Sequence, residues 1–261
     1  MILEYHRPTD LETALALLAR TEPLTVPLGG GTVLNRPSQA SFAVVDLQGL
    51  GLKEIRSSGS RVALGACVTL QMLLEASGMP AGLQEAVSRE TTYNLRQVAT
   101  VAGSLVAADG RSPFTTALLA LDAELECQKM DSSTPGKSLV FNISLGDLLP
   151  FRQERLAGML ITQVSLPARA RLAYTAVTRT PSDWPLVCAA VARWPSGRTR
   201  LALGGWGKAP LLAMDGPEPG GLETAARQAY LQAADEWASA KYRSEMAATL
   251  AVRGLQSLEN S

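Results

Sequence analysis

Two segments rich in small residues have the composition needed to bind a ligand through backbone groups. Residues 29–32 read GGGT and follow the apolar stretch LTVPL. Glycine permits positive φ angles, and it lets a ligand come within hydrogen-bonding distance of peptide N–H groups, an arrangement that binds phosphate. Residues 100–104 read TVAGS and add two hydroxyl groups. If these segments face each other across a cleft, they can hold a diphosphate between them.

Each segment also has an interpretation without a ligand. A glycine run after a strand is often only a tight turn, and small residues also occur where two backbone segments cross closely. Nucleotide-binding motifs of defined spacing are missing. No Lys-Ser or Lys-Thr pair follows the glycines as in a P-loop, and Val33 and Leu34 break the GxGxxG dinucleotide spacing. A nucleotide site here therefore requires a different kind of fold.

Composition excludes several classes of function. The 261 residues are 46% hydrophobic, with 24 basic and 24 acidic residues and no basic block, which argues against nucleic acid or an anionic membrane as the partner. Cys67, Cys127 and Cys188 are isolated, and His6 is the single histidine. This set excludes a zinc site, an iron–sulfur cluster held by this chain alone, and a Ser/His/Asp triad.

The same sequence indicates a cytoplasmic protein. Sparse cysteines in odd number are typical of a reducing compartment. The first residues lack the features of a secretory leader, and no apolar run reaches the length of a membrane span.

Three predicted units position the two segments. Residues 1–56 form a βαββ unit, in which Thr9 and Glu12 make a capping box at the start of the helix. Residues 57–167 contain a strand at 61–66, helices from 69 and in the eighties, a helix that begins with Ser112 and Pro113, and strands near 125, 140 and 160–167. Residues 168–261 contain three antiparallel strands, YTAVT, LVCAAVARW and RTRLALGGW, and then two helices. This pattern is typical of an α+β protein.

The motifs also occur in a recognisable order. The glycine turn is followed by VVDLQGL, ALGACVTL, TVAGSL and LLALDAEL, and the C-terminal third contains AVTRTPSDWPLVCAAVA, LALGGWGKAP and SAKYRSEMAATLAVRGL. Over essentially its whole length the chain resembles the FAD-binding, medium subunit of molybdenum hydroxylases of the xanthine dehydrogenase and carbon monoxide dehydrogenase type. The resemblance implies a two-lobed vanillyl-alcohol-oxidase-type (PCMH-type) FAD-binding fold plus a C-terminal α+β domain.

The resemblance also implies a cofactor site between the two lobes. FAD would lie extended there, with its pyrophosphate on the two small-residue segments and its flavin edge near Ile161. Asp109 would accept a hydrogen bond from a ribose or ribityl hydroxyl, although it is equally a turn residue in ADGRS. The resemblance implies neither a catalytic side chain nor a metal ligand. The implied FAD-binding residues are Leu28, Gly29, Gly30, Gly31, Thr32, Val33, Leu34, Ala99, Thr100, Ala102, Gly103, Ser104, Asp109 and Ile161.

The implied function is electron transfer inside a molybdopterin-dependent oxidoreductase. The partners would be a molybdopterin-binding large subunit and a small subunit with two 2Fe–2S clusters, and the resemblance allows a dimer of such heterotrimers. FAD would pass the electrons on to an external acceptor, since the redox chemistry belongs to the cofactors.

Three departures from the family pattern support an alternative. Ala102 stands where the family usually has glycine, Pro113 where an aspartate is common, and Ala176 where a lysine lies near the flavin ring. A scaffold or assembly subunit that has lost FAD would explain all three. A stand-alone FAD reductase similar to the cell-wall enolpyruvyl-sugar reductases is a further alternative, which the C-terminal resemblance disfavours.

Overall fold

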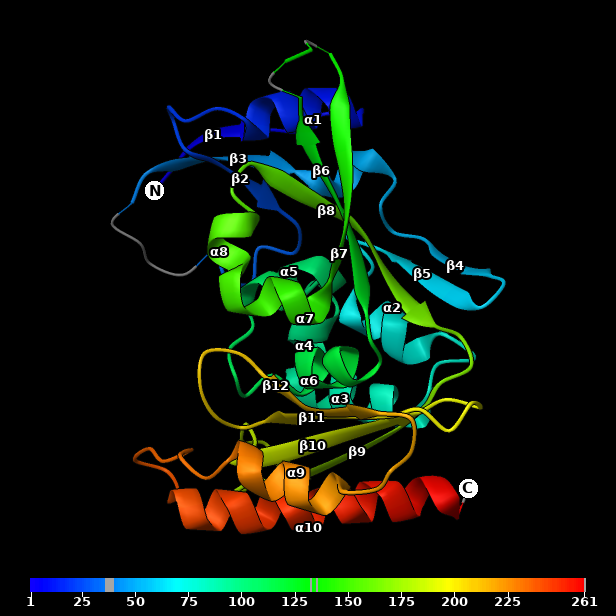
Figure 1. Cartoon of the computed structure of the whole chain (residues 1–261). Coiled ribbons are helices and arrows are strands. Elements are labelled where there is room, and N and C mark those ends of the chain that lie inside the picture. Colours follow the sequence, from blue (N-terminus) through cyan, green and yellow to red (C-terminus); the bar gives the residue numbers. More distant parts are fainter. Residues whose placement is uncertain (36–39, 132, 135, 261) are drawn as a thin grey trace.

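The computed structural model of the chain describes residues 1–35, 40–131, 133–134 and 136–260, and over these residues the strands form three sheets (Figure 1). The first sheet is parallel, with the order β1–β3–β2, and α1 packs against it. Its central strand β3 is buried along its whole length. The elements of this part are β1 Ile2–His6, α1 Leu11–Leu18, β2 Thr25–Leu28, β3 Phe42–Asp46 and the 3-10 turn η1 Leu47–Leu50.

The cap of α1 differs from the prediction. The side chain of Asp10, not Thr9, caps the helix, because its carboxylate accepts a hydrogen bond of 2.8 Å from the amide of Thr13. A carboxylate at this position also interacts favourably with the positive end of the helix dipole. The helix therefore begins one residue later than the capping box indicates.

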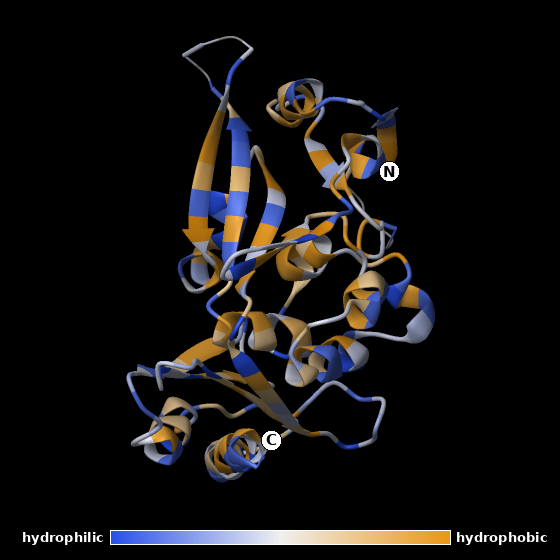
Figure 2. Ribbon diagram, turned by 90° about the vertical axis from the view of Figure 1, so that its right-hand side faces the viewer, coloured by the Kyte–Doolittle hydropathy of each residue, from blue (hydrophilic) through white to orange (hydrophobic). Residues whose placement is uncertain are grey.

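The second sheet is antiparallel, with the order β4–β5–β8–β6–β7. Hydrophobic and hydrophilic residues alternate along its long strands (Figure 2), which is the pattern of strands with one face in the core. The elements of this part are β4 Ile55–Ser58, β5 Arg61–Gly65, α2 Leu70–Glu75, α3 Ala81–Glu90, α4 Tyr93–Arg96, α5 Val101–Ala107, α6 Pro113–Ala120, β6 Glu124–Met130, β7 Ser138–Ser144, α7 Leu145–Leu148, the 3-10 turn η2 Leu149–Phe151, α8 Arg152–Arg155 and β8 Met159–Pro167.

The C-terminal sheet has four antiparallel strands in the order β12–β11–β10–β9, so the prediction of three strands was wrong. The missed strand β12 pairs with β11 at the sheet edge and is only half buried. Backbone pairing holds it in place, and its sequence LLAMDG carries little alternation of apolar residues. The elements are β9 Arg171–Val177, β10 Val187–Arg193, β11 Thr199–Gly204, β12 Leu211–Gly216, α9 Leu222–Ala229 and α10 Ala240–Glu259.

One apolar core joins the central helices to the C-terminal sheet. Helices α3 and α6 pack on one face of this sheet, and α9 and α10 cover the other face (Figure 1). Leu172, Cys188 and Ala202 of the sheet belong to the same buried cluster as Leu83 and Phe114 of the helices. The predicted boundaries after residues 56 and 167 stay predictions. Within the described ranges, none of the helices is long and apolar enough to span a membrane.

A glycine contact also ties the connection between α5 and α6 to the C-terminal sheet. The amide of Gly110 donates to the carbonyl of Gly207 at 3.1 Å, and the amide of Gly205 donates to the carbonyl of Gly110 at 2.7 Å. A Cβ atom on Gly110 would lie 2.0 Å from the carbonyl oxygen of Trp206. Residue 110 must therefore be glycine for the two backbones to approach this closely.

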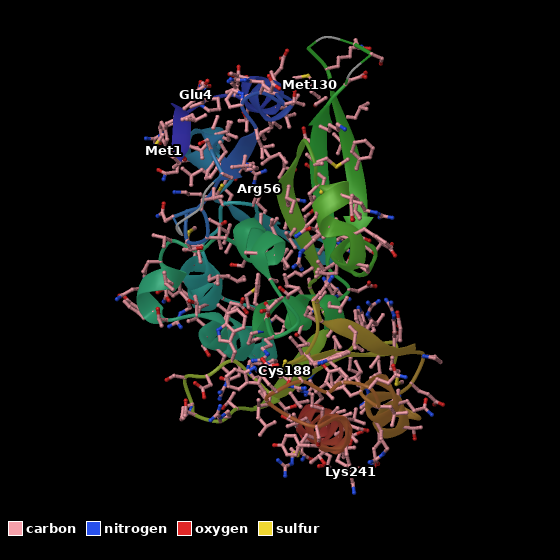
Figure 3. The ribbon with its side chains drawn as sticks, turned by 90° about the vertical axis from the view of Figure 1, so that its left-hand side faces the viewer. Met1, Glu4, Arg56, Met130, Cys188 and Lys241 are labelled. Atoms are coloured by element: carbon pink, nitrogen blue, oxygen red, sulfur yellow. The ribbon has the colours of Figure 1, made fainter. Side chains whose placement is uncertain are left out.

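A buried polar cluster lies at the same junction. The carboxylate of Glu90 accepts hydrogen bonds from the hydroxyl of Ser112 at 2.9 and 3.0 Å and from the amide of Phe114 at 2.9 Å, so it caps α6. Burial outweighs these hydrogen bonds and raises the pKa of Glu90 to about 7. Cys188 of β10 lies nearby, on the face of the C-terminal sheet that meets α6 (Figure 3). The junction thus contains a carboxyl group that titrates near neutral pH.

Candidate cofactor-binding site

A cavity of about 380 Å³ lies where the turn after β2 meets α5 and the start of β8. Its walls are mostly apolar, and among the described residues no charged side chain lines it. The lining residues are Val26, Pro27, Gly29, Gly30, Gly31, Thr32, Val33, Leu34, Leu47, Ala66, Thr100, Ala102, Gly103, Val106, Ala107, Leu156, Met159, Leu160 and Ile161.

The glycine turn touches the backbone that leads into α5. A Cβ atom on Gly30 would lie 1.7 Å from the carbonyl oxygen of Val98, and one on Gly29 would lie 2.8 Å from the Oγ1 atom of Thr100. Gly31 adopts a φ of 70°, in the left-handed region that favours glycine. The close crossing of two backbones, which was the interpretation without a ligand, is therefore present. It also brings the two small-residue segments together at one end of the cavity.

The turn presents a run of unpaired backbone donors. Among the described residues, no protein acceptor receives a hydrogen bond from the amides of residues 29–34. These residues are half buried except for Val33, which is more exposed. Half-buried amides without acceptors are costly unless a ligand or water takes their hydrogen bonds, and phosphate oxygens suit them. The donor set of this turn therefore fits the pyrophosphate of a dinucleotide.

The second segment is the first turn of a helix and not a loop. Thr100 is the N-cap of α5, where its Oγ1 accepts a hydrogen bond of 3.1 Å from the amide of Gly103. The amides of Val101 and Ala102 donate to the carbonyls of Val68 and Ala66 at 2.8 and 3.1 Å. These three amides are thus already bonded within the protein. This side of the cavity contributes small side chains and one hydroxyl group.

Thr100 is the polar side chain on this wall best placed to meet a ligand. It is only 6% exposed and lines the cavity. Its hydroxyl oxygen accepts the Gly103 hydrogen bond, but its hydroxyl proton has no acceptor among the residues that the structure describes. A hydroxyl group has one proton to donate. Thr100 can therefore cap the helix and donate to a ligand at the same time.

Most of the predicted site residues come together at this cavity. Those that line it are Gly29, Gly30, Gly31, Thr32, Val33, Leu34, Thr100, Ala102, Gly103 and Ile161, whereas Leu28, Ala99, Ser104 and Asp109 do not. Asp109 is exposed and accepts a hydrogen bond of 2.8 Å from the amide of Arg111, as its interpretation as a turn residue predicts. Of the three departures, Ala102 lines the cavity, Pro113 is buried in α6, and Ala176 lies in β9.

Sequence reasoning missed the apolar part of the wall. Val106 and Ala107 follow Gly103 by one helical turn, so they would have been found had α5 been recognised as a helix. Leu156 comes from the connection before β8, Met159 is the first residue of β8, and no motif marks them. The remaining missed residues are Val26, Pro27, Leu47, Ala66 and Leu160.

A cavity with a turn of unpaired amides at one end and apolar walls elsewhere is typical of a site for a phosphate-bearing cofactor. The model of the family "FAD binding domain in molybdopterin dehydrogenase" matches residues 1–169. The chain belongs to this family of FAD-binding domains. The family predicted from the motifs is thereby confirmed, and so is FAD as the cofactor of that family.

Two curated relatives have sequence identities just below 30% to this chain. The uncharacterised protein YgfM of Escherichia coli (strain K12) is 29% identical over 208 residues, which cover 78% of this chain and 75% of YgfM. The alpha subunit of the 6-hydroxypseudooxynicotine dehydrogenase complex of Paenarthrobacter nicotinovorans is 28% identical over 174 residues, which cover 63% of this chain and 56% of that subunit.

Solved structures establish the fold over nearly the whole chain. A chain of quinoline 2-oxidoreductase from Pseudomonas putida 86 superposes with a TM-score of 0.79 at 21% identity, covering 98% of this chain and 96% of that one. A chain of CO dehydrogenase from Oligotropha carboxidovorans gives a TM-score of 0.78 at 24% identity, with 97% and 96% covered. The predicted α+β FAD-binding fold is confirmed, apart from the additional strand of the C-terminal sheet.

Proposed function

We propose that this chain is the electron-transferring FAD subunit of a molybdopterin-dependent oxidoreductase. In this role it takes electrons from 2Fe–2S clusters of a small partner subunit and passes them to an external acceptor. A molybdopterin-binding large subunit would supply these electrons to the clusters. The family match and the complex named for one relative support this proposal. When bound, FAD supplies the two-electron and one-electron chemistry that such a relay requires.

The observation that carries the proposal is the run of unpaired amides on the wall of the cavity. Residues 29–34 would hold the pyrophosphate by backbone hydrogen bonds, and the hydroxyl of Thr100 would donate to it from the facing wall. Ile161 and Leu156 would pack against the ring system and exclude water. The chain's task is to bind and orient the cofactor, since no charged side chain of the described lining is available for acid–base chemistry.

One observation favours the alternative, a scaffold subunit that has lost FAD. The amides of Val101, Ala102 and Gly103 are satisfied within the protein, so the cofactor would receive backbone hydrogen bonds from one side only. A one-sided site predicts weaker binding. Co-purification with the molybdenum subunit without flavin would support this alternative.

FAD binding is tested by the absorption spectrum of the purified chain after incubation with FAD and desalting. We expect flavin bands that survive the column, with about one FAD per chain after denaturation. A chain that stays colourless at saturating FAD contradicts the flavoprotein assignment and leaves the scaffold function.

The role of Thr100 is tested by substitution. Thr100→Val has nearly the same shape but removes both the cap on Gly103 and the free hydroxyl proton. Losing the hydrogen bond from the hydroxyl to the ligand predicts an FAD affinity about tenfold lower, measured by titration of flavin fluorescence, whereas losing the cap lowers the stability of the helix. Thr100→Ser keeps the hydroxyl and should bind within about threefold of the wild type, since a lost methyl group costs less than a lost hydrogen bond. If the valine variant bound FAD as tightly as the wild type, the hydroxyl of Thr100 would not contact FAD.

A further inference from the structure

The connection between α7 and β8 supplies part of the cavity wall but is itself poorly anchored. Leu156 of this connection and Met159, the first residue of β8, line the cavity and pack against the central core. By contrast, none of the residues of α8 is buried, and Phe151 just before it is 56% exposed. In Figure 1, α8 lies on the side of the molecule where the end of β2 approaches α5. A surface segment therefore positions the side chain of Leu156, which faces the cavity.

Arg152 provides the long-range polar contact of this segment. Its Nη2 atom donates a hydrogen bond to the carbonyl of Ala108, the C-cap residue of α5. A guanidinium at the C-terminus of a helix satisfies a free carbonyl and interacts favourably with the helix dipole. Because α5 carries Thr100, Ala102 and Val106 on the cavity wall, this contact links two walls of the cavity.

The other terminal nitrogen of the same guanidinium has no hydrogen-bond acceptor among the described residues. This atom, Nη1 of Arg152, is buried. Burial lowers the pKa of the Arg152 guanidinium, and the nearby charge of Asp109 opposes this effect. A buried donor without an acceptor destabilises the folded chain, and this donor would gain a hydrogen bond to water if the segment moved away from α5. Hydration of Nη1 would therefore offset part of the free energy lost when the hydrogen bond to Ala108 breaks.

We propose that residues 151–158 form a flap over the cofactor cavity and that Arg152 is the positioning residue that latches this flap to the end of α5. The inference rests on the proposed function, because it concerns how the same cavity admits and retains FAD. Arg152 acts through Leu156, which lies one helical turn further along and faces the cavity. Arg152 itself does not line the cavity.

The backbone allows this motion, and the cofactor favours closure. Gly158 adopts a φ of 68° at the C-terminal end of the segment, where a glycine can change conformation at little steric cost. With the cavity filled, Leu156 gains an apolar surface to pack against, which stabilises the closed position of the flap. Closure and binding are therefore thermodynamically coupled, because a ligand that prefers one conformation shifts the population toward it.

The latch is tested by the rates of FAD association and dissociation, followed by flavin fluorescence after rapid mixing. Arg152→Met removes the contact with Ala108 and should raise both rate constants by about tenfold, because the flap opens more often. Arg152→Lys keeps one charged donor and should lie between this variant and the wild type. The matched control is Arg155→Met in the same helical turn, whose guanidinium lies 5.9 Å from the ring of Phe151 and should leave both rates unchanged.

Two results would overturn the proposal. Faster dissociation with unchanged association would mean that Arg152 only shapes a static wall. Equal effects of the Arg152 and Arg155 variants would mean that the contact with Ala108 is not the latch. If Arg152→Met does not fold, the lysine variant decides between these outcomes.

A second readout needs no cofactor. Glutamyl endopeptidase cleavage after Glu154, an exposed residue present in all variants, should be faster in Arg152→Met than in the wild type or Arg155→Met. Equal cleavage rates would contradict the latch. If the wild type does not bind FAD, the proposed function fails, but the cleavage comparison still decides whether Arg152 holds the flap.

Discussion

Replacing Gly30 with alanine is expected to lower the affinity for FAD by at least about 100-fold, or about 2.7 kcal/mol. The new Cβ atom would lie 1.7 Å from the carbonyl oxygen of Val98 and 2.5 Å from its carbonyl carbon. Both are backbone atoms, so no side-chain rotation relieves the overlap and the turn must move away from α5. The unpaired amides of residues 29–34 would then lose their position relative to the cavity.

The matched control is Gly146→Ala in α7. There the nearest atom to the new methyl group is Cδ1 of Leu119 at 3.6 Å, an ordinary contact, and alanine favours the helix. Affinity for FAD should be unchanged in this variant. Circular dichroism of Gly30→Ala separates local displacement of the turn from loss of the fold. Retained folding with retained FAD affinity would show that the glycine turn does not hold the cofactor.

The second large effect is a pH dependence of stability that originates in Glu90. Its pKa is about 7 in the folded chain and near 4.5 in the unfolded chain, so the folded state holds the proton more tightly. The contribution of protonated Glu90 to the free energy of unfolding is complete below about pH 4.5 and is lost as the pH rises through about 7. A difference of this size corresponds to about 3 kcal/mol between the two limits.

Glu90→Gln provides the comparison, because glutamine can still accept from Ser112 and Phe114 but does not titrate. Urea unfolding of both proteins should be measured at pH 5 and pH 8. The wild type should lose about 2.5 kcal/mol relative to the variant between these two conditions, since all other titrating groups are shared and part of the effect already falls below pH 5. Parallel pH profiles of the two proteins would show that Glu90 does not titrate in this range.

The sequence was sufficient to predict the family, the βαββ start and the glycine turn. These features depend on local patterns, such as three consecutive glycines directly after a short apolar strand. The helix α5 escaped prediction because VAGSLVA contains a glycine and β-branched residues, which lower helix propensity. Its formation depends on the cap by Thr100 and on the burial of Val101 and Leu105 in the tertiary structure.

The distant parts of the cavity wall could not be predicted for a different reason. Leu156 and Met159 reach the cavity because β8 pairs between β5 and β6, which brings the end of the preceding connection beside the glycine turn. The position of these two residues depends on the order of the strands in the sheet, which cannot be read from a single sequence. The latch between Arg152 and Ala108 joins positions 44 residues apart and is invisible for the same reason.

The core shared by α6 and the C-terminal sheet bears on how chains of this kind can be recombined. The family match ends at residue 169, yet Leu172, Cys188 and Ala202 complete the apolar cluster around Phe114. A chimera joined at residue 169 would need a C-terminal sheet whose apolar side chains pack against α6. In this chain the module that sequence comparison delineates is smaller than the one that must fold together.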